Sequence, residues 1–200
     1  MKRRALGLVA YEPTWRAMQA FNAARDRETP DEMWLCEHPS VFTLGLAGRR
    51  EHVIAPGSIP VVATDRGGQV TYHGPGQAMA YLLLDLRRNG LGAKALVRRI
   101  EQSVIDLLAG YGIEGERQTG MPGVYVRGAK VAAIGLRIAR GCSYHGVALN
   151  VDADLEPFTR IDPCGYPGLA CTRLADLGVT DKMDAVQQRL ASHLEKCLTT

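Results

Sequence analysis

The sequence predicts a single α+β domain with a mostly antiparallel or mixed sheet flanked by helices. Its 200 residues suit one domain with a buried core. Short apolar runs typical of strands are mixed with only three helical patterns, without the regular alternation of a doubly wound sheet. No repeat, linker or low-complexity tract interrupts the chain, so we expect one domain over residues 1–200.

The first half of the chain contains one predicted helix among several strands. Residues 5–10 are an apolar run that predicts a first strand. Residues 14–28 predict a helix, because Trp15, Met18 and Phe21 recur on one face. Four further strands are expected at residues 33–36, 41–44, 61–64 and 77–86.

The second half contains the clearest helical pattern, at residues 93–109, and Gly110 suits its C-terminal cap. The apolar face of this helix consists of Leu96, Ile100, Val104 and Leu107. A last helix is predicted from the apolar positions Met183, Val186, Leu190, Leu194 and Cys197. Between the two helices we expect strands at residues 124–126, 130–137 and 144–150 and one helical turn at residues 155–160.

Composition and charge exclude several classes of protein. The chain is 46% hydrophobic and 22% charged, which is typical of a globular protein. A net charge of +3 is too small to favour nucleic-acid binding, although a mildly basic surface suits acidic protein partners. No apolar run approaches the roughly 18 residues of a membrane span. The five cysteines are odd in number and include no CxxC pair, which predicts a reducing, cytoplasmic location.

A glycine-rich stretch at residues 66–77 is the first candidate for a site. Its four glycines and one proline make it a poor helix or strand, but they allow the backbone to approach a ligand closely. Two interpretations stay open: a binding loop that carries Arg66 and His73, or a glycine-rich hairpin turn. The stretch is not a phosphate-binding P-loop, since GxxxxGK[ST] is missing.

A single lysine, Lys130, falls on the otherwise apolar face of a predicted strand, with Ala132, Ile134 and Leu136. Burial beside an apolar wall would lower the pKa of this lysine and make it chemically useful. From the pattern alone we favour the simpler interpretation, in which the stem covers apolar surface while the ammonium reaches water.

Cys164 lies between a proline and a glycine, which predicts a turn that exposes its thiol. By spacing alone, its base partner would be His145 or His73, because Cys–His is the commoner pairing of nucleophile and base. The two histidines occupy similar hydroxyl-Tyr-His-Gly elements, which suggests that both line one cavity.

The other cysteines carry weaker signals. Cys36 and Cys197 lie on apolar elements and are expected in the core. Cys142 and His145 have the spacing of half a zinc site, but no second pair follows, so we expect no metal.

Four segments, taken together and in this order, resemble the lipoyl(octanoyl) transferase family of lipoate biosynthesis. The matching residues are Arg66-Gly67-Gly68, Thr71-Tyr72-His73-Gly74-Pro75-Gly76-Gln77, Lys130, Ile134-Gly135-Leu136-Arg137, His145-Gly146, Ala148-Leu149-Asn150 and Pro163-Cys164-Gly165. The likeness covers most of residues 30–180. It implies the fold that biotin and lipoate protein ligases share.

The resemblance also implies an activity, the transfer of an octanoyl group from an acyl-carrier-protein thioester to a lysine of lipoyl domains. The implied acceptors are the lipoyl domains of 2-oxoacid dehydrogenases and the glycine-cleavage carrier protein. Cys164 would carry the acyl group as a thioester, with Lys130 as its acid–base partner and no cofactor. The implied substrate-binding residues are Arg66, Gly67, Gly68, Gln69, Val70, Thr71, Tyr72, His73, Ala133, Ile134, Gly135, Gly146, Val147 and Ala148. His145 would then shape the pocket.

Two alternatives stay open. An ATP-dependent lipoate or biotin protein ligase on the same fold would activate a free acid and needs no cysteine, so the Cys164 turn argues against it. A non-catalytic module that binds lipoyl proteins suits the mildly basic charge and the glycine-rich loops. A thiol remote from Lys130 would favour this second alternative.

Overall fold

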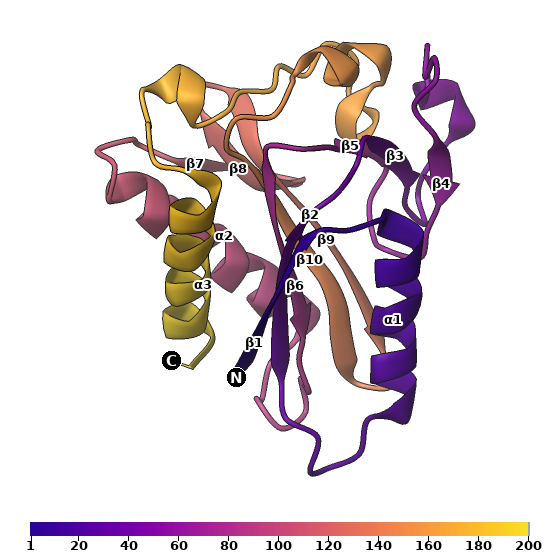
Figure 1. The fold of residues 1–200 in the computed structure, drawn as a ribbon, viewed down its shortest axis with the longest axis vertical. Helices are drawn as coiled ribbons and strands as arrows, with labels where there is room; N and C mark the ends of the chain where they lie inside the picture. The colour runs from indigo at the N-terminus through magenta and orange to yellow at the C-terminus, as the bar shows by residue number, and fades with distance from the viewer. Residues whose placement is uncertain (200) are drawn as a thin grey trace.

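The computed structural model describes residues 1–199, which form two sheets and three α-helices (Figure 1). The strands are β1 (Lys2–Leu8), β2 (Glu32–Glu37), β3 (Val41–Leu44), β4 (Val61–Ala63), β5 (Val70–His73), β6 (Gln77–Leu83), β7 (Glu116–Gln118), β8 (Met121–Val126), β9 (Ala129–Ala139) and β10 (Cys142–Asn150). The helices are α1 (Tyr11–Ala24), α2 (Ala93–Ala109) and α3 (Met183–Thr199). Single 3-10 turns lie at Arg50–His52, Glu156–Arg160, Pro163–Gly165 and Ala175–Leu177.

Seven strands form the main sheet, in the order β1-β2-β6-β10-β9-β8-β7. All neighbours in it are antiparallel except β1 and β2, which run parallel. The second sheet has the order β4-β3-β5, with β3 parallel to β4 and antiparallel to β5. The predicted α+β class with a mixed, mostly antiparallel sheet is therefore confirmed.

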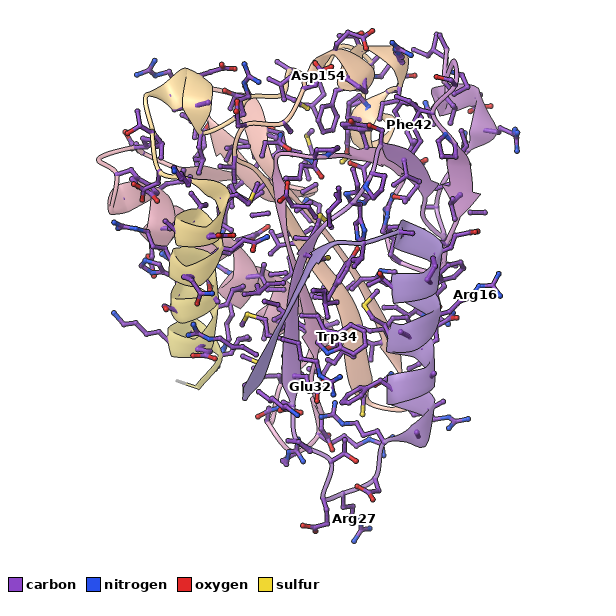
Figure 2. The ribbon with its side chains drawn as sticks, viewed as in Figure 1. Arg16, Arg27, Glu32, Trp34, Phe42 and Asp154 are labelled. Carbon is purple, nitrogen blue, oxygen red and sulfur yellow. The ribbon has the colours of Figure 1, made fainter. Side chains whose placement is uncertain are left out.

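The main sheet is covered on both faces, and β6 shows how. Its side chains alternate, so Ala80 and Leu82 pack with α2 and α3 while Met79 and Tyr81 pack with α1. Trp34 of β2 belongs to the α1 side and lies between that strand and the helix (Figure 2). Figure 1 shows α1 and the small sheet on one side and α2 and α3 on the other. Burial on both faces explains why β6 reads as a continuous apolar run.

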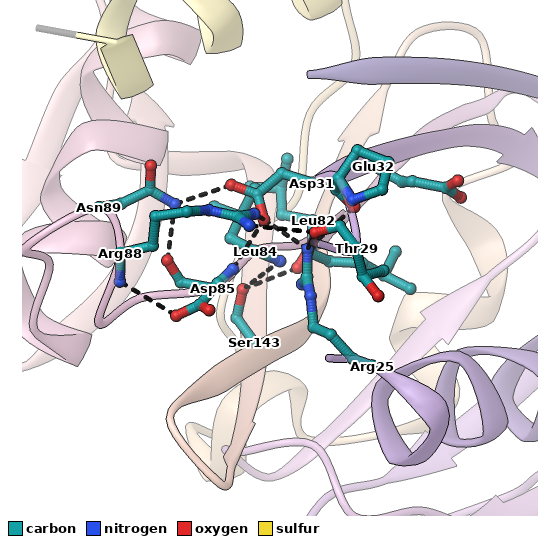
Figure 3. Close-up of polar contacts among 12 residues, drawn as sticks. Arg25, Thr29, Asp31, Glu32, Leu82, Leu84, Asp85, Arg88, Asn89 and Ser143 are labelled. Carbon is teal, nitrogen blue, oxygen red and sulfur yellow. Dashed lines mark hydrogen bonds and ion pairs between the residues drawn. The ribbon is translucent and has the colours of Figure 1, made fainter. Parts of the chain in front are cut away.

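A polar cluster closes the end of the sheet where the chain leaves α1 (Figure 3). The Asp31 carboxylate accepts hydrogen bonds from Arg25 at 2.5 Å, from Arg88 at 2.6 Å and from the Asp85 main-chain N–H at 2.8 Å. Arg25 also donates to the Leu83 carbonyl at 3.0 Å. Helix α1 ends at Ala24 and strand β6 ends at Leu83, beside this cluster, and both end earlier than the sequence predicts.

Helix α1 also begins at Tyr11 rather than at residue 14. Pro13 lies in its first turn, where a missing N–H breaks no intrahelical hydrogen bond. The proline therefore marks the inside of the helix start and not a boundary before it.

The glycine-rich stretch is neither a plain loop nor a hairpin turn. Residues Val70–His73 form β5, which pairs with β3, and the glycines flank this strand without entering it. The polar strand β7 (ERQ) was also absent from the sequence prediction, because it lacks an apolar face. Within residues 1–199, no helix combines the length and apolar character needed to cross a bilayer.

Candidate active site

Cys164 lies in the tight turn Pro163–Gly165, which neighbouring segments hold in place. The Gly165 N–H donates to the Asp162 carbonyl at 2.8 Å, and the Asp162 carboxylate lies 3.0 Å from the His52 ring. Cys164 has φ 59° and ψ 15°, a left-handed conformation that costs of order 1–3 kcal/mol for a residue with a side chain. Such strain persists only where the surroundings impose it, and here it accompanies a half-buried thiol.

Lys130 stands near the start of β9 and faces this thiol. Its main chain bonds to the segment after the turn, through the Ala170 carbonyl at 2.8 Å and the Thr172 N–H at 2.9 Å. The residue is 4% exposed, and its ammonium donates to the sulfur of Cys164 at 2.9 Å and to the Pro122 carbonyl at 3.3 Å. The interpretation of Lys130 as a lysine that reaches water is therefore wrong.

The charge state of Lys130 also differs from the sequence-based expectation. Burial lowers its pKa, but the charge and hydrogen bond of Cys164, with a smaller effect of Tyr125, outweigh burial and raise the pKa above its ordinary value. The ammonium also lies 5.1 Å from the centre of the Tyr125 ring, a cation–π distance. Lys130 is therefore a cation at neutral pH while Cys164 is free.

A narrow, largely apolar pocket leads from Cys164 along the α1 side of the main sheet. Small residues occupy the middle strands: Ala133 of β9 stands opposite Ala148 of β10, and Gly135 stands opposite Gly146. The larger side chains of β6 form a wall beside them. The residues implied by the resemblance that line this pocket are Arg66, Gly68, Gln69, Val70, Thr71, His73, Ala133, Ile134, Gly135, Gly146, Val147 and Ala148.

Two implied residues, Gly67 and Tyr72, lie outside this pocket. Gly67 joins the glycine-rich loop to β9, through its N–H and the Leu136 carbonyl at 2.8 Å. Tyr72 points to the other side of β5, where its hydroxyl lies 2.9 Å from that of Ser40. It borders a smaller cavity that also contacts Lys130, Cys164 and Cys171.

Arg66 is a buried cation in the pocket wall, and it organises the glycine-rich loop. Its guanidinium donates to the Thr43 carbonyl at 2.6 Å and to the carbonyls of Gly67 at 2.9 Å and Gln69 at 2.8 Å. Burial lowers its pKa, yet an arginine stays charged at neutral pH. The loop is thus shaped by the arginine that precedes its glycines.

The two histidines that spacing suggested as partners of Cys164 bond elsewhere. His73 lies 3.3 Å from the Thr43 hydroxyl and 3.2 Å from the Gln77 side-chain oxygen. Burial, and then the charge of Arg66, hold the pKa of His73 well below its usual range, so this ring is neutral. His145 donates to Asp65 at 3.0 Å. In the structure, the group that meets the thiol is Lys130.

Several pocket residues escaped the sequence-based reasoning. Tyr11, Met79 and Tyr81 line the pocket. Asp65 accepts a hydrogen bond from the pocket-lining ring of His145. Met79 and Tyr81 read only as core positions of a buried strand. The sequence offered one indication for Asp65, since this residue directly precedes Arg66, Gly67 and Gly68 of the glycine-rich stretch.

The remaining cysteines are free thiols with different surroundings. Cys36 is buried in β2 as expected, and burial raises its pKa to about 12. Cys197 is only partly buried on α3, which differs from the expected core position. Cys171 borders the smaller cavity, and burial raises its pKa to about 12. Across residues 1–199, no three His, Cys, Asp or Glu side chains gather as metal ligands would.

The pocket, the thiol and the buried lysine can be compared with known proteins. A model of the lipoyl protein ligase A/B catalytic domain matches residues 10–195. The chain belongs to this family. Among curated relatives, an octanoyltransferase of Thiobacillus denitrificans is 60% identical over 195 residues, which cover 98% of this chain and 89% of that protein. An octanoyltransferase of Alkalilimnicola ehrlichii is 60% identical over 190 residues, covering 95% and 88% of the two chains.

Solved structures of the family and of biotin ligases share the fold. A putative lipoate protein ligase of T. acidophilum superposes with a TM-score of 0.77 at 14% identity, over 99% of this chain and 86% of that one. A lipoate-protein ligase A bound with ATP gives the same TM-score at 14% identity, with the same coverage. The biotin protein ligase of Aquifex aeolicus gives 0.61 at 12% identity, over 98% and 70% of the chains. The predicted fold is thereby confirmed.

Proposed function

We propose that this chain transfers an octanoyl group from an acyl-carrier-protein thioester to a lysine amine of a lipoyl domain, through a thioester on Cys164. The observation that carries the proposal is the buried ammonium of Lys130, 2.9 Å from the thiol at the mouth of an apolar pocket. The family and the curated octanoyltransferases at 60% identity support the acyl group and the reaction class.

In the first half-reaction, Cys164 enters as the thiolate beside the Lys130 ammonium. Its sulfur attacks the donor carbonyl, a bond forms between that sulfur and the acyl carbon, and the bond to the carrier sulfur breaks. Lys130 gives its proton to the departing carrier thiolate. One thioester replaces another, so the step is nearly thermoneutral and needs no ATP.

Acylation prepares Lys130 for the second half-reaction. The charge and hydrogen bond of Cys164 hold the pKa of Lys130 up, and a thioester supplies neither. Burial, which opposes the charged form, then dominates, so the lysine stays a neutral amine. It accepts the proton of the incoming acceptor amine as the amide bond forms, and the departing Cys164 thiolate restores the original pair.

We infer the partners from the family to which the chain belongs. The donor is an octanoyl-carrier protein, and the acceptors are lipoyl domains of 2-oxoacid dehydrogenases and the glycine-cleavage carrier protein. Both substrates must reach the same thiol in turn. Five free cysteines suit a reducing compartment, so we place the reaction in the cytoplasm.

Intact-mass measurement tests the proposal. Octanoyl-carrier protein should add one octanoyl group to the wild-type chain, and a lipoyl domain added afterwards should remove that group and gain it. Cys164→Ser should acquire no adduct and transfer nothing, because a serine hydroxyl is hardly ionised at neutral pH. Cys142→Ser is the matched control and should react like wild type. A Cys164→Ser chain with near wild-type turnover contradicts the covalent route.

An ATP-dependent ligase is the second candidate, since the chain shares its fold with a lipoate-protein ligase A bound with ATP. That activity would release pyrophosphate when lipoate and ATP are supplied without a thioester donor. We expect no pyrophosphate above background. A non-catalytic lipoyl-binding module needs no thiol at the lysine, so it gives no reason for the 2.9 Å contact between Cys164 and Lys130.

A further inference from the structure

One carboxylate, that of Asp65, joins two elements that surround the pocket. It accepts hydrogen bonds from Trp15 at 2.7 Å and Gln19 at 3.0 Å on α1. It also accepts bonds from the His145 ring at 3.0 Å and from the Tyr144 hydroxyl, both on β10. Nothing in the acyl-transfer chemistry above uses this carboxylate, although it contacts a pocket-lining ring.

The bonds from Tyr144 and His145 require a break in the strand. Consecutive side chains of a regular strand point to opposite faces, yet these two reach the same carboxylate. His145 has φ +60°, the left-handed conformation that histidine rarely adopts, and this turns its ring toward Asp65. The ring is stacked on Tyr144 at 5.1 Å and meets the Tyr81 ring edge-on at 6.1 Å.

The spacing of residues along β10 places the His145 ring toward the end of the pocket away from Cys164. Ala148 borders both the pocket and the smaller cavity around Lys130 and Cys164, so it marks the reacting end. His145 also lines the pocket and lies three residues further along β10, which corresponds to roughly 10 Å. An acyl chain that starts at the thiol and follows β10 therefore meets the His145 ring.

We propose that Asp65 is a positioning residue that holds the His145 ring across the inner end of the pocket and so limits the length of the accepted acyl chain. The inference rests on the proposed acyl transfer through Cys164. Asp65 touches no reacting atom, because it acts only through His145. A longer chain would have to displace a ring that one hydrogen bond and two aromatic contacts hold in place.

The charge of Asp65 supports this arrangement. Burial raises the pKa of the carboxyl, but the bonds from His145, Tyr144, Gln19 and Trp15 outweigh burial and hold it well below its usual range. The carboxylate is therefore an acceptor at neutral pH, and it selects the His145 tautomer that carries its proton on Nε2.

The test compares acyl chains of different length as donors. Hexanoyl, octanoyl, decanoyl and dodecanoyl thioesters of the carrier are mixed with the chain, and the rate of the adduct on Cys164 is followed by intact mass. In Asp65→Asn, the decanoyl-to-octanoyl rate ratio should rise about tenfold, since one or two methylenes in a pocket are worth that much. Asp65→Asn should change mainly the KM for the decanoyl donor, because Cys164 and Lys130 are untouched.

A matched control is Asp181→Asn. That carboxylate also accepts a tyrosine hydroxyl, from Tyr111 at 2.9 Å, and pairs with Arg189 at 3.2 Å, but it borders no part of the pocket. Its chain-length profile should match wild type. A profile that broadens equally in this control would mean that loss of any such bond loosens the fold, and would overturn the assignment to Asp65.

His145→Gly decides the question if Asp65→Asn does not fold. Glycine adopts a positive φ without strain, so the backbone keeps its path while the ring is removed. This variant should show the same broadened profile, and the double variant should broaden it no further. Folded Asp65→Asn or His145→Gly chains with the wild-type ratio overturn the inference alone. Wild-type chain that forms no adduct with any donor overturns the proposed function, and this inference with it.

Discussion

At the scale of single residues, the candidate site depends on the buried ammonium of Lys130 beside the half-buried thiol of Cys164. Removing charges from water is costly, and a buried pair recovers that cost only with close geometry and further hydrogen bonds. Lys130 has both, through the Cys164 sulfur at 2.9 Å and the Pro122 carbonyl at 3.3 Å. Removing one partner therefore leaves the other isolated, so we expect the pair to respond strongly to substitution.

The role of Lys130 is tested by separating thiol reactivity from acyl transfer. Lys130→Ala should slow alkylation of Cys164 by iodoacetamide at pH 7, because the ammonium that favours the thiolate is gone. Acyl transfer should fall further, by roughly 10²–10⁴-fold, since the proton carrier is lost as well. Alkylation rates and single-turnover transfer, measured on the same samples, give the two effects separately.

Lys130→Arg and His145→Gln complete this test. The arginine keeps a charge but gives up no proton, so alkylation should be partly preserved while amide formation fails. His145→Gln should leave alkylation nearly unchanged, since that ring bonds to Asp65. If His145→Gln slows alkylation and Lys130→Ala does not, the assignment of Lys130 is wrong.

At the scale of secondary-structure elements, β9 and β10 create the pocket by carrying small residues side by side. Ala133 pairs with Ala148, and Gly135 pairs with Gly146, across the same two strands. The neighbouring positions on the opposite face, such as Ala132 and Leu149, belong to the core with α2 and α3. One strand thus contributes to the hydrophobic core with one face and to the pocket with the other.

Ala148→Leu should narrow the pocket near its reacting end. Three extra carbon atoms there compete with the acyl chain, so acylation by octanoyl-carrier protein should fall at least about tenfold. Alkylation by iodoacetamide should change little, because that reagent needs no acyl pocket. Ala109→Leu, at an exposed position of α2, is the control. Equal loss in both assays would show that the substitution disturbs the thiol and not the pocket.

Helix α1 is attached to the site through Asp65, and this predicts a pH dependence of stability. The pKa of Asp65 is lower in the folded chain than in the unfolded one, so its contribution is complete above the unfolded value of about 4 and is lost as the pH falls toward the folded value. Asp65→Asn should therefore have a lower Tm than wild type at pH 7. The difference should shrink below about pH 4. Thermal unfolding by circular dichroism between pH 7 and pH 3 measures it, and a constant difference contradicts the prediction.

At the scale of the whole molecule, the segments around Cys164 form a rim with exposed apolar and basic side chains. Leu46 is 62% exposed, Ile54 61% and Tyr166 44%, and each lies in a segment bonded to the glycine-rich loop or to the Cys164 turn. Arg49 and Arg50 are exposed in the same region, where the Arg49 N–H donates to the Gln69 side chain at 3.1 Å. Acyl carrier proteins are acidic, so the positive charges of this rim would attract the carrier proposed as donor.

Binding of the carrier protein should therefore weaken with salt. The screening length falls from about 30 Å to about 8 Å between 0.01 M and 0.15 M salt, so KM for the octanoyl carrier should rise severalfold. Arg49→Ala and Arg50→Ala should reduce both the association rate and its salt dependence. Arg98→Ala, on α2 across the main sheet, should behave as wild type. A KM that stays flat across this range would count against electrostatic docking.

Local patterns predicted most elements but misplaced their ends. Helix α2 was predicted with its observed bounds, because its apolar spacing and following glycine are features of neighbouring residues. The end of α1 was misplaced; there the chain leaves the helix at Arg25, whose side chain bonds to the Leu83 carbonyl, 58 residues away. The strand inside the glycine-rich stretch was missed for a similar reason, since β3 stabilises β5 by pairing.

The sequence by itself determined the fold class, the order of most helices and strands, and the family. These properties depend on local composition and on the order of short motifs along the chain. It also singled out Cys164 as a thiol in a turn, which the structure shows to be half-buried. The family resemblance implied Lys130 as the partner of this thiol, but only the tertiary structure showed their contact, between residues 34 apart in the chain. Only the tertiary structure showed that Asp65 bonds to the pocket-lining ring of His145, 80 residues away. The physical reason is that periodicity reports which face a residue occupies, whereas packing of distant elements decides which charges become neighbours.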